Sequence, residues 1–178
     1  MNLKNNLVSI FLTIFALGLF LTFSGCGIYS MSGAATTAKT IQIEPLFNNT
    51  DLAPANLAQN FTNRLKDYYQ QNSSLRVIKE DGELQIEGII SQYALTTTSP
   101  TGASPTDISF AAQTRLTIGV KINYVDIIEP KNSFKDRTFT FYKDFDNNLN
   151  FTTIQDQYER LIFDQIMIDI FNATVANW

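Results

Sequence analysis

The most regular alternation of apolar and polar side chains along the chain lies in residues 108–128. Even positions there are apolar and odd positions are mostly polar, namely Ile108, Phe110, Ala112, Leu116, Ile118, Val120, Ile122 and Tyr124 against Gln113, Arg115, Thr117, Lys121 and Asn123. Because successive side chains of a strand point to opposite faces of its sheet, this pattern predicts a long strand with one buried and one solvated face.

Shorter alternations of the same kind predict four further strands, which cover residues 39–47, 75–79, 83–95 and 134–145. Turn-forming residues separate these segments, among them Asp81-Gly82 and Pro130-Lys131-Asn132. Residues 96–107 contain two prolines and a glycine, so we expect a loop there.

Two segments carry apolar residues at helical spacing. The first covers about 52–71, where one face carries Leu57, Phe61 and Leu65. A turn and helix cap are expected in residues 48–51. The second helix is expected to begin with a cap at Thr152 or Thr153 and has a wide apolar stripe. This order predicts an α+β domain over residues 39–178, with two helices packed on one face of a largely antiparallel four- to five-stranded sheet.

The chain begins with the pattern of an exported lipoprotein. Lys4 precedes a predominantly apolar run over residues 7–23, and two small residues then lead to Cys26. The alternative is a transmembrane anchor, but the run is at the short limit for a span and has a single flanking lysine. We therefore predict a signal peptide over 1–25, a diacylglycerol and an acyl chain such as palmitate on Cys26, and a flexible tether over 26–38.

Composition narrows the possible chemistry. Cys26 is the only cysteine, the chain has no histidine, and its formal net charge is −4. These facts exclude Ser-His-Asp and Cys-His catalysis, zinc sites built on His or Cys, and a disulfide within the chain. An acidic chain is also a poor candidate for bulk nucleic-acid binding. We expect no cofactor other than the covalent lipid on Cys26.

Two acidic segments have a functional and a simpler interpretation. Residues 144–148 match the opening of a calcium loop, but Leu149 replaces its glycine and Gln155 replaces its final glutamate. The simpler interpretation is a strand that ends in a turn. Glu80, Asp81 and Glu83 could supply the carboxylates of a hydrolase, although a solvated hairpin explains them better.

Basic residues are the candidate binding groups. Lys131, Lys135 and Arg137 cluster at the last predicted hairpin, and Arg115 and Lys121 lie on the solvated face of the long strand. Such groups could bind phosphates through charge-assisted hydrogen bonds. Acidic residues lie among them, so ordinary solvation of charged side chains explains the pattern equally well.

The order of these segments resembles a known family. The segment Cys26-Gly27-Ile28-Tyr29-Ser30 precedes a strand that ends in Phe47-Asn48-Asn49 and a helix with Phe61 and Leu65. Leu84-Gln85-Ile86-Glu87-Gly88, the long alternating strand and the C-terminal helix follow. Together they resemble the lipopolysaccharide-assembly lipoproteins of the LptE type, in the version found in Bacteroidetes-like bacteria.

The resemblance implies a non-enzymatic lipoprotein of the cell outer membrane that faces the periplasm or a barrel lumen. Its partners would be outer-membrane lipid, lipopolysaccharide, and the large LptD-like barrel that it helps to assemble and plugs. The family's lipopolysaccharide contacts are basic residues on loops at one end of the sheet, and the resemblance implies such a role for Lys131, Lys135 and Arg137. Arg115, on the solvated face of the long strand, is added to this set as a fourth candidate. Two alternatives stay open: a free periplasmic lipoprotein that binds a small lipid or peptide between sheet and helices, and, less favoured, a carboxylate hydrolase.

Overall fold

The computed structural model describes residues 36–98 and 113–176. The predicted signal peptide, Cys26, nearly all of the predicted tether and most of the predicted loop lie outside these ranges. The described elements are β1 (Thr40–Ile43), β2 (Phe47–Asn48), α2 (Leu57–Asn72), β3 (Arg76–Ile78), β4 (Leu84–Thr98), β5 (Gln113–Asp126), the short 3-10 helix η2 (Pro130–Asn132), β6 (Phe134–Asp146) and α3 (Phe151–Thr174).

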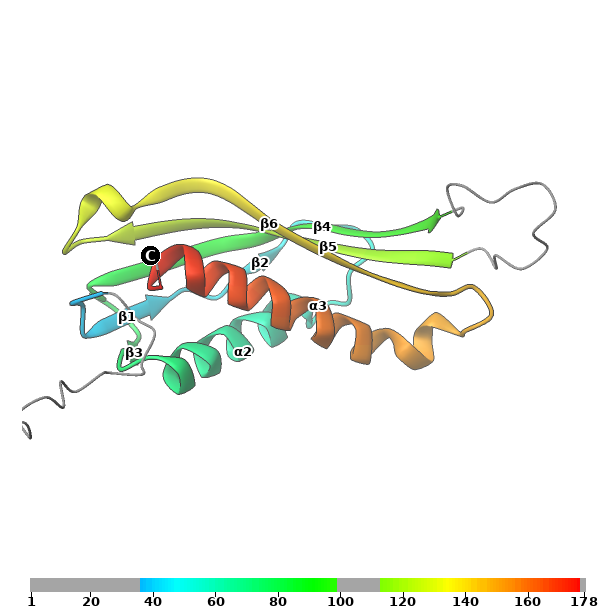
Figure 1. Ribbon diagram of the computed structural model, residues 1–178, viewed down its shortest axis with the longest axis horizontal. Helices are drawn as coiled ribbons and strands as arrows, with labels where there is room; N and C mark the ends of the chain where they lie inside the picture. The colour runs from blue at the N-terminus through cyan, green and yellow to red at the C-terminus, as the bar shows by residue number, and fades with distance from the viewer. Residues whose placement is uncertain (1–35, 99–112, 177–178) are drawn as a thin grey trace, which may run out of the picture. The chain divides into compact units, whose positions relative to one another are not determined.

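The strands form one mixed sheet in the order β3-β1-β4-β5-β6, with β2 beside β4. Strands β4, β5 and β6 make a long antiparallel meander, whereas β1 runs parallel to both β3 and β4. Both helices lie on the same side of the sheet (Figure 1). Helix α2 contacts β2 and β3, and α3 contacts β5 and β6, whereas Leu95 and Thr97 near the end of β4 are exposed on the helix-side face.

The predicted α+β class is confirmed, but the sheet has six strands and is partly parallel. Two local causes explain the difference from a largely antiparallel four- to five-stranded sheet. The predicted strand over 39–47 is divided into β1 and β2 at Pro45, which has no N–H to donate to a ladder. Helix α2 then carries the chain back along the sheet, so β3 pairs with β1 in parallel.

Helix boundaries differ from the prediction because the capping residues are different. Helix α2 begins at Leu57, whose N–H donates to the Pro54 carbonyl, rather than near residue 52. The Asn48 side chain accepts from the Thr50 N–H and so forms a local turn. Helix α3 is capped by Asn150, whose Oδ1 accepts the Thr152 N–H at 3.0 Å, and not by Thr152 or Thr153.

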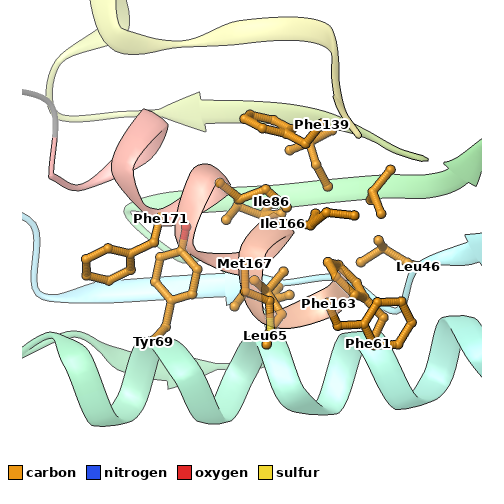
Figure 2. Packing of buried hydrophobic residues seen from close by; sticks show 14 of the residues in the cluster. Leu46, Phe61, Leu65, Tyr69, Ile86, Phe139, Phe163, Ile166, Met167 and Phe171 are labelled. Atoms are coloured by element: carbon orange, nitrogen blue, oxygen red, sulfur yellow. The ribbon is translucent and has the colours of Figure 1, made fainter. Parts of the chain in front are cut away.

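The core fills the space between the sheet and the two helices (Figure 2). Phe61 of α2 and Phe163 of α3 meet edge to face with ring centroids 4.9 Å apart. The predicted buried face of the long strand is confirmed, because every even position of β5 from 116 to 124 is fully buried. At the far end of the helix pair, the buried Tyr69 hydroxyl hydrogen-bonds to Thr174 Oγ1 at 2.6 Å.

Truncation of the core should be costly at fully buried positions and harmless at exposed ones. Phe61→Ala and Leu116→Ala remove side chains that are 0% exposed, and each should lower the free energy of unfolding by about 2–5 kcal/mol. Leu52→Ala is the control, because Leu52 is 71% exposed and its loss should change stability by less than about 0.5 kcal/mol. Denaturant unfolding followed by circular dichroism measures all three, and equal effects would contradict this core.

Candidate functional site

The sheet face that points away from the helices carries mostly polar side chains. In register across the strands, this uncovered face presents Gln85, Glu87, Thr117, Lys121, Asn123, Thr138, Thr140 and Asp144. Glu87 accepts a hydrogen bond from the Asn123 side chain at 2.9 Å, one strand away. A face of this kind can meet a polar partner surface without burying unsatisfied groups.

Arg115 lies on the uncovered face, where it forms a bidentate pair with Asp144 on β6. Its Nε and Nη2 donate to the two carboxylate oxygens at 2.7 and 2.8 Å. The guanidinium also lies 3.6 Å from the centroid of the Tyr142 ring. The hydrogen bonds from Arg115, with its charge, hold the pKa of Asp144 below its usual value. The positive charge of Arg115 is therefore largely compensated within the sheet.

The turn between β5 and β6 is built around the buried side chain of Asp126. Its Oδ1 accepts the Glu129 N–H at 2.7 Å, and its own N–H donates to Ser133 Oγ. Lys131 in η2 is highly exposed, and its Nζ lies 3.3 Å from a Glu129 carboxylate oxygen. Surface pairs of this kind contribute little to stability, so Lys131 can exchange its partner for another anion.

A β-bulge lies beside Lys135 and Arg137, the two other basic residues of this hairpin. The ladder between β5 and β6 shifts between Ile122 and Tyr124, where Asp136 adopts a positive φ of 54°. Beyond the shift Arg137 is opposite Ile122, which puts it on the helix-side face. Its guanidinium lies 5.4 and 5.1 Å from the ring centroids of Phe134 and Phe139, while its side chain stays exposed.

The structure therefore places three of the four predicted lipopolysaccharide-binding residues on one hairpin. Lys131, Lys135 and Arg137 share the β5–β6 hairpin and are all exposed. Arg115 lies seven residues along β5 from the partner of Arg137, which corresponds to roughly 23 Å at 3.3 Å per residue. We call the group Lys131, Lys135 and Arg137 the hairpin cations.

The two acidic segments have structural roles that the sequence did not fully predict. The carboxylate of Glu83 accepts the backbone N–H groups of Lys39 and Thr40 and so holds the start of β1. The predicted hairpin around Asp81 is wrong, because β1 lies between β3 and β4. Asp146 ends β6, and its Oδ1 accepts the Asn148 N–H in a turn. Within the described ranges no three acidic, His or Cys side chains gather to form a metal site.

A buried polar cluster between the sheet and α3 was not predicted. The Tyr93 hydroxyl donates to Glu159 Oε1 at 2.8 Å, and the Gln155 amide donates to both. Burial and the Glu159 contact raise the pKa of the Tyr93 hydroxyl. In the sequence Glu159 is one polar residue of an amphipathic helix, so only the tertiary contact reveals it. Among the described residues no buried side-chain nitrogen or oxygen lacks a hydrogen-bond partner, and this cluster follows that rule.

Two surface hollows lie outside the interface between sheet and helices. One of about 310 Å³ lies between α2 and α3 and is lined by Asn60, Asn63, Arg64 and Arg160 among others. The other, of about 360 Å³, lies beside β2 and is lined by Glu44, Phe47, Glu87 and Ile89 among others. The interface itself is filled by apolar side chains (Figure 2), which disfavours a ligand groove there. Neither described helix is long and apolar enough to cross a membrane.

Comparison with protein families finds one matching model. It is described as LptE, lipopolysaccharide-assembly, and it matches residues 38–174. No curated protein matches the chain.

Several solved structures are similar to the chain at low sequence identity. A hypothetical protein from Chlamydia trachomatis is 13% identical, with a TM-score of 0.51 over 79% of this chain and 99% of that one. A protein from Xanthomonas campestris is 9% identical, with a TM-score of 0.50 over 76% and 82% of the two chains. A minor lipoprotein from Acinetobacter baumannii is 14% identical, with a TM-score of 0.46 over 76% and 91%.

The pair between Arg115 and Asp144 should make stability depend on pH in a defined direction. Because the folded pKa of Asp144 is lowered, its stabilising effect is present above the unfolded value of about 3.9 and is lost as the pH falls through the folded value. Arg115→Gln should therefore lower the melting temperature at neutral pH. The difference from the wild-type protein should shrink below about pH 4.

The matched control is Arg76→Gln, which removes an exposed strand arginine that forms no ion pair among the described residues. Its melting temperature should follow the wild-type value at every pH. A pH-independent effect of Arg115→Gln would show that the ion pair does not stabilise the sheet.

Proposed function

We propose, because this chain belongs to the LptE family of lipopolysaccharide-assembly proteins, that it is the lipid-anchored partner of an outer-membrane lipopolysaccharide-transport barrel. In this proposal it helps the barrel to assemble, plugs its lumen and assists insertion of lipopolysaccharide into the outer leaflet. The role is non-enzymatic. The family match over residues 38–174 is the observation that carries the proposal, since it spans nearly the whole described domain.

The uncovered sheet face supports the part of the proposal that concerns the barrel. Large outer-membrane barrels have polar interiors, so a protein inside one needs a polar surface that can exchange hydrogen bonds with water for hydrogen bonds with the wall. Neutral hydroxyls of Thr117, Thr138 and Thr140 and the paired charges of Arg115 and Asp144 provide such a surface. Most of the buried apolar side chains pack on the helix side of the sheet, and Val125 and Tyr142 are large apolar side chains exposed on the uncovered face.

The hairpin cations support direct contact with lipopolysaccharide. Lys131, Lys135 and Arg137 are exposed on one hairpin, and their charges are at most weakly paired. Phosphate groups accept strong, charge-assisted hydrogen bonds from such side chains. Arg115 is a weaker candidate, because a phosphate would have to displace the bidentate carboxylate of Asp144. We therefore assign phosphate contact to the hairpin cations and test Arg115 separately.

The proposed anchor is the lipid on Cys26. Each buried methylene contributes about 0.8 kcal/mol to membrane binding, so a diacylglycerol with a further acyl chain holds the protein at the membrane durably. Gly27 follows the cysteine, without an aspartate that would retain the protein in the inner membrane. The predicted location is therefore the outer membrane.

The barrel partnership and the lipopolysaccharide contact need separate measurements. The full lipidated chain should co-purify with a large outer-membrane barrel under mild detergent, and failure to do so would remove the central claim. The triple variant Lys131→Gln, Lys135→Gln, Arg137→Gln should still co-purify. Each lost charge-assisted contact should weaken lipopolysaccharide binding by about 1.5–3 kcal/mol, roughly ten- to a hundredfold.

The matched control is Lys66→Gln, Arg76→Gln, Lys79→Gln, which removes the same charges from α2 and from the β3 side of the sheet. All the removed groups are surface charges, so melting temperatures should change little in both variants. Arg115→Gln should bind lipopolysaccharide like the wild-type protein. Equal weakening by the hairpin and control variants would show a general charge effect instead of a site.

Lipidation at Cys26 gives a further expected outcome. Mass spectrometry of the membrane fraction should find a mature chain that begins at Cys26 and carries lipid. Cys26→Ser should leave an unlipidated precursor, whereas Ser30→Ala, four residues away, should be processed normally. An intact 1–25 segment or a free thiol in the wild-type protein would refute this prediction.

A further inference from the structure

The two long antiparallel strands at the borders of the sheet have free edges of very different character. Within the described ranges, residues 92–98 of β4 pair with β5 on one side only, because β1 pairs with Leu84–Ile86 and β2 with Ile89–Ile90. On the opposite border β6 is likewise paired on one side only. A free edge presents a row of backbone N–H and C=O groups that another strand can pair with.

The edge of β6 carries the charges that usually prevent such pairing. Its 13 residues include Lys135, Asp136, Arg137, Lys143, Asp144 and Asp146. The free edge of β4 has the sequence Gln-Tyr-Ala-Leu-Thr-Thr-Thr, with no charge, proline or glycine. Charged edges resist the addition of a strand, whereas an uncharged edge rich in β-branched and aromatic residues favours it. The bulge next to Ile90 lies outside this stretch, so the stretch itself is regular.

Leu95 is an exposed apolar side chain at this edge. It is directly opposite Leu116, which is fully buried, so both belong to the helix-side face of the sheet. Leu95 is nevertheless 41% exposed. Among residues 36–98 and 113–176 it has a strand neighbour towards β5 and none on the free side. A further strand at this edge would cover an apolar side chain that the domain leaves in water.

We propose that this edge pairs with the same edge of a second copy of the chain, in an antiparallel dimer with two-fold symmetry. An axis through Leu95 sets residue 95 against its own copy, 94 against 96, 93 against 97 and 92 against 98. Because the stretch has no charge, no like charges meet across the axis. The contact is isologous, so each edge is used once and the assembly closes at two copies.

The length of the free edge and the position of Leu95 are compatible with this two-fold pairing. The seven residues span roughly 23 Å of ladder at 3.3 Å per residue, and the two copies of Leu95 would cover each other. Both helix layers would lie on the same side of one continuous sheet.

This inference goes beyond the proposed function and does not rest on it. A barrel that encloses one domain excludes the second copy, so the dimer is the state of the lipoprotein outside that complex.

Site-directed cross-linking tests the pairing and its register. The full chain, purified from membranes in a mild detergent, carries a single cysteine at Cys26. Opposed residues of an antiparallel pair have Cα atoms about 4.5–5.5 Å apart, within the range of a disulfide. Leu95→Cys should therefore form an intermolecular disulfide on mild oxidation. Gln92→Cys should cross-link efficiently only when mixed with Thr98→Cys, and Thr140→Cys on β6 should not cross-link.

Charge substitution tests the same contact without a covalent bond. Leu95→Lys places two positive charges on the two-fold axis and should weaken dimerisation by about tenfold or more, measured by native mass spectrometry. Thr140→Lys adds the same charge to the β6 edge and should leave the dimer unchanged. Circular dichroism reports whether both variants fold. If Leu95→Lys does not fold, the cysteine variants still decide the question.

Several outcomes would overturn the proposal. A wild-type chain that is monomeric at every concentration that stays in solution, with no cross-link at Leu95→Cys, would do so. Equal cross-linking at 95 and 140 would indicate random collision. Assemblies larger than two copies would indicate open-ended aggregation. A photoreactive residue at position 95 that captures only a different polypeptide in cells would assign this edge to that partner.

Discussion

The one-sided burial of β5 is the constraint on which the rest of the domain depends. Leu116, Ile118 and Val120 lie in its centre with no exposed surface, and each is aligned with an apolar residue of β4 or β6. Because side chains alternate between faces, burying this set fixes the register of both neighbours. Both helices must then lie on the same face, and the opposite face is free to be polar. The division between a helix-covered apolar face and an uncovered, mostly polar face follows directly.

The sequence predicts the parts of this fold that depend on local periodicity. The long strand, both helices and the α+β class follow from the spacing of apolar residues. Parallel pairing of β1 with β3 and β4 does not, because it depends on which strands become neighbours after α2. The division at Pro45 was foreseeable from the missing N–H. The bulges next to Ile90 and Ile122 were not, since a bulge appears only when two strands are aligned.

In the candidate site, too, the features that depend on strand alignment could not be predicted from the sequence. The hairpin cations are close in sequence, so a predicted hairpin was enough to bring them together. Arg115 and Asp144 are 29 residues apart, and their pairing depends on the register between β5 and β6. From the sequence alone Arg115 could therefore be taken for an unpaired cation, although in the structure the Asp144 carboxylate balances its charge. The bulge at Asp136 likewise decides on which face Arg137 lies.

The clamp that Glu83 forms on the start of β1 has a mechanical consequence. The chain enters the domain at Lys39 and Thr40, and the carboxylate of Glu83 holds both N–H groups. Strand β1 then lies between β3 and β4, hydrogen-bonded on both sides. A pull on the preceding segment along the strand would act on these hydrogen bonds in shear, all at once, instead of peeling them apart one by one. The proposed lipid anchor would thus load a strand that is hydrogen-bonded to neighbours on both sides.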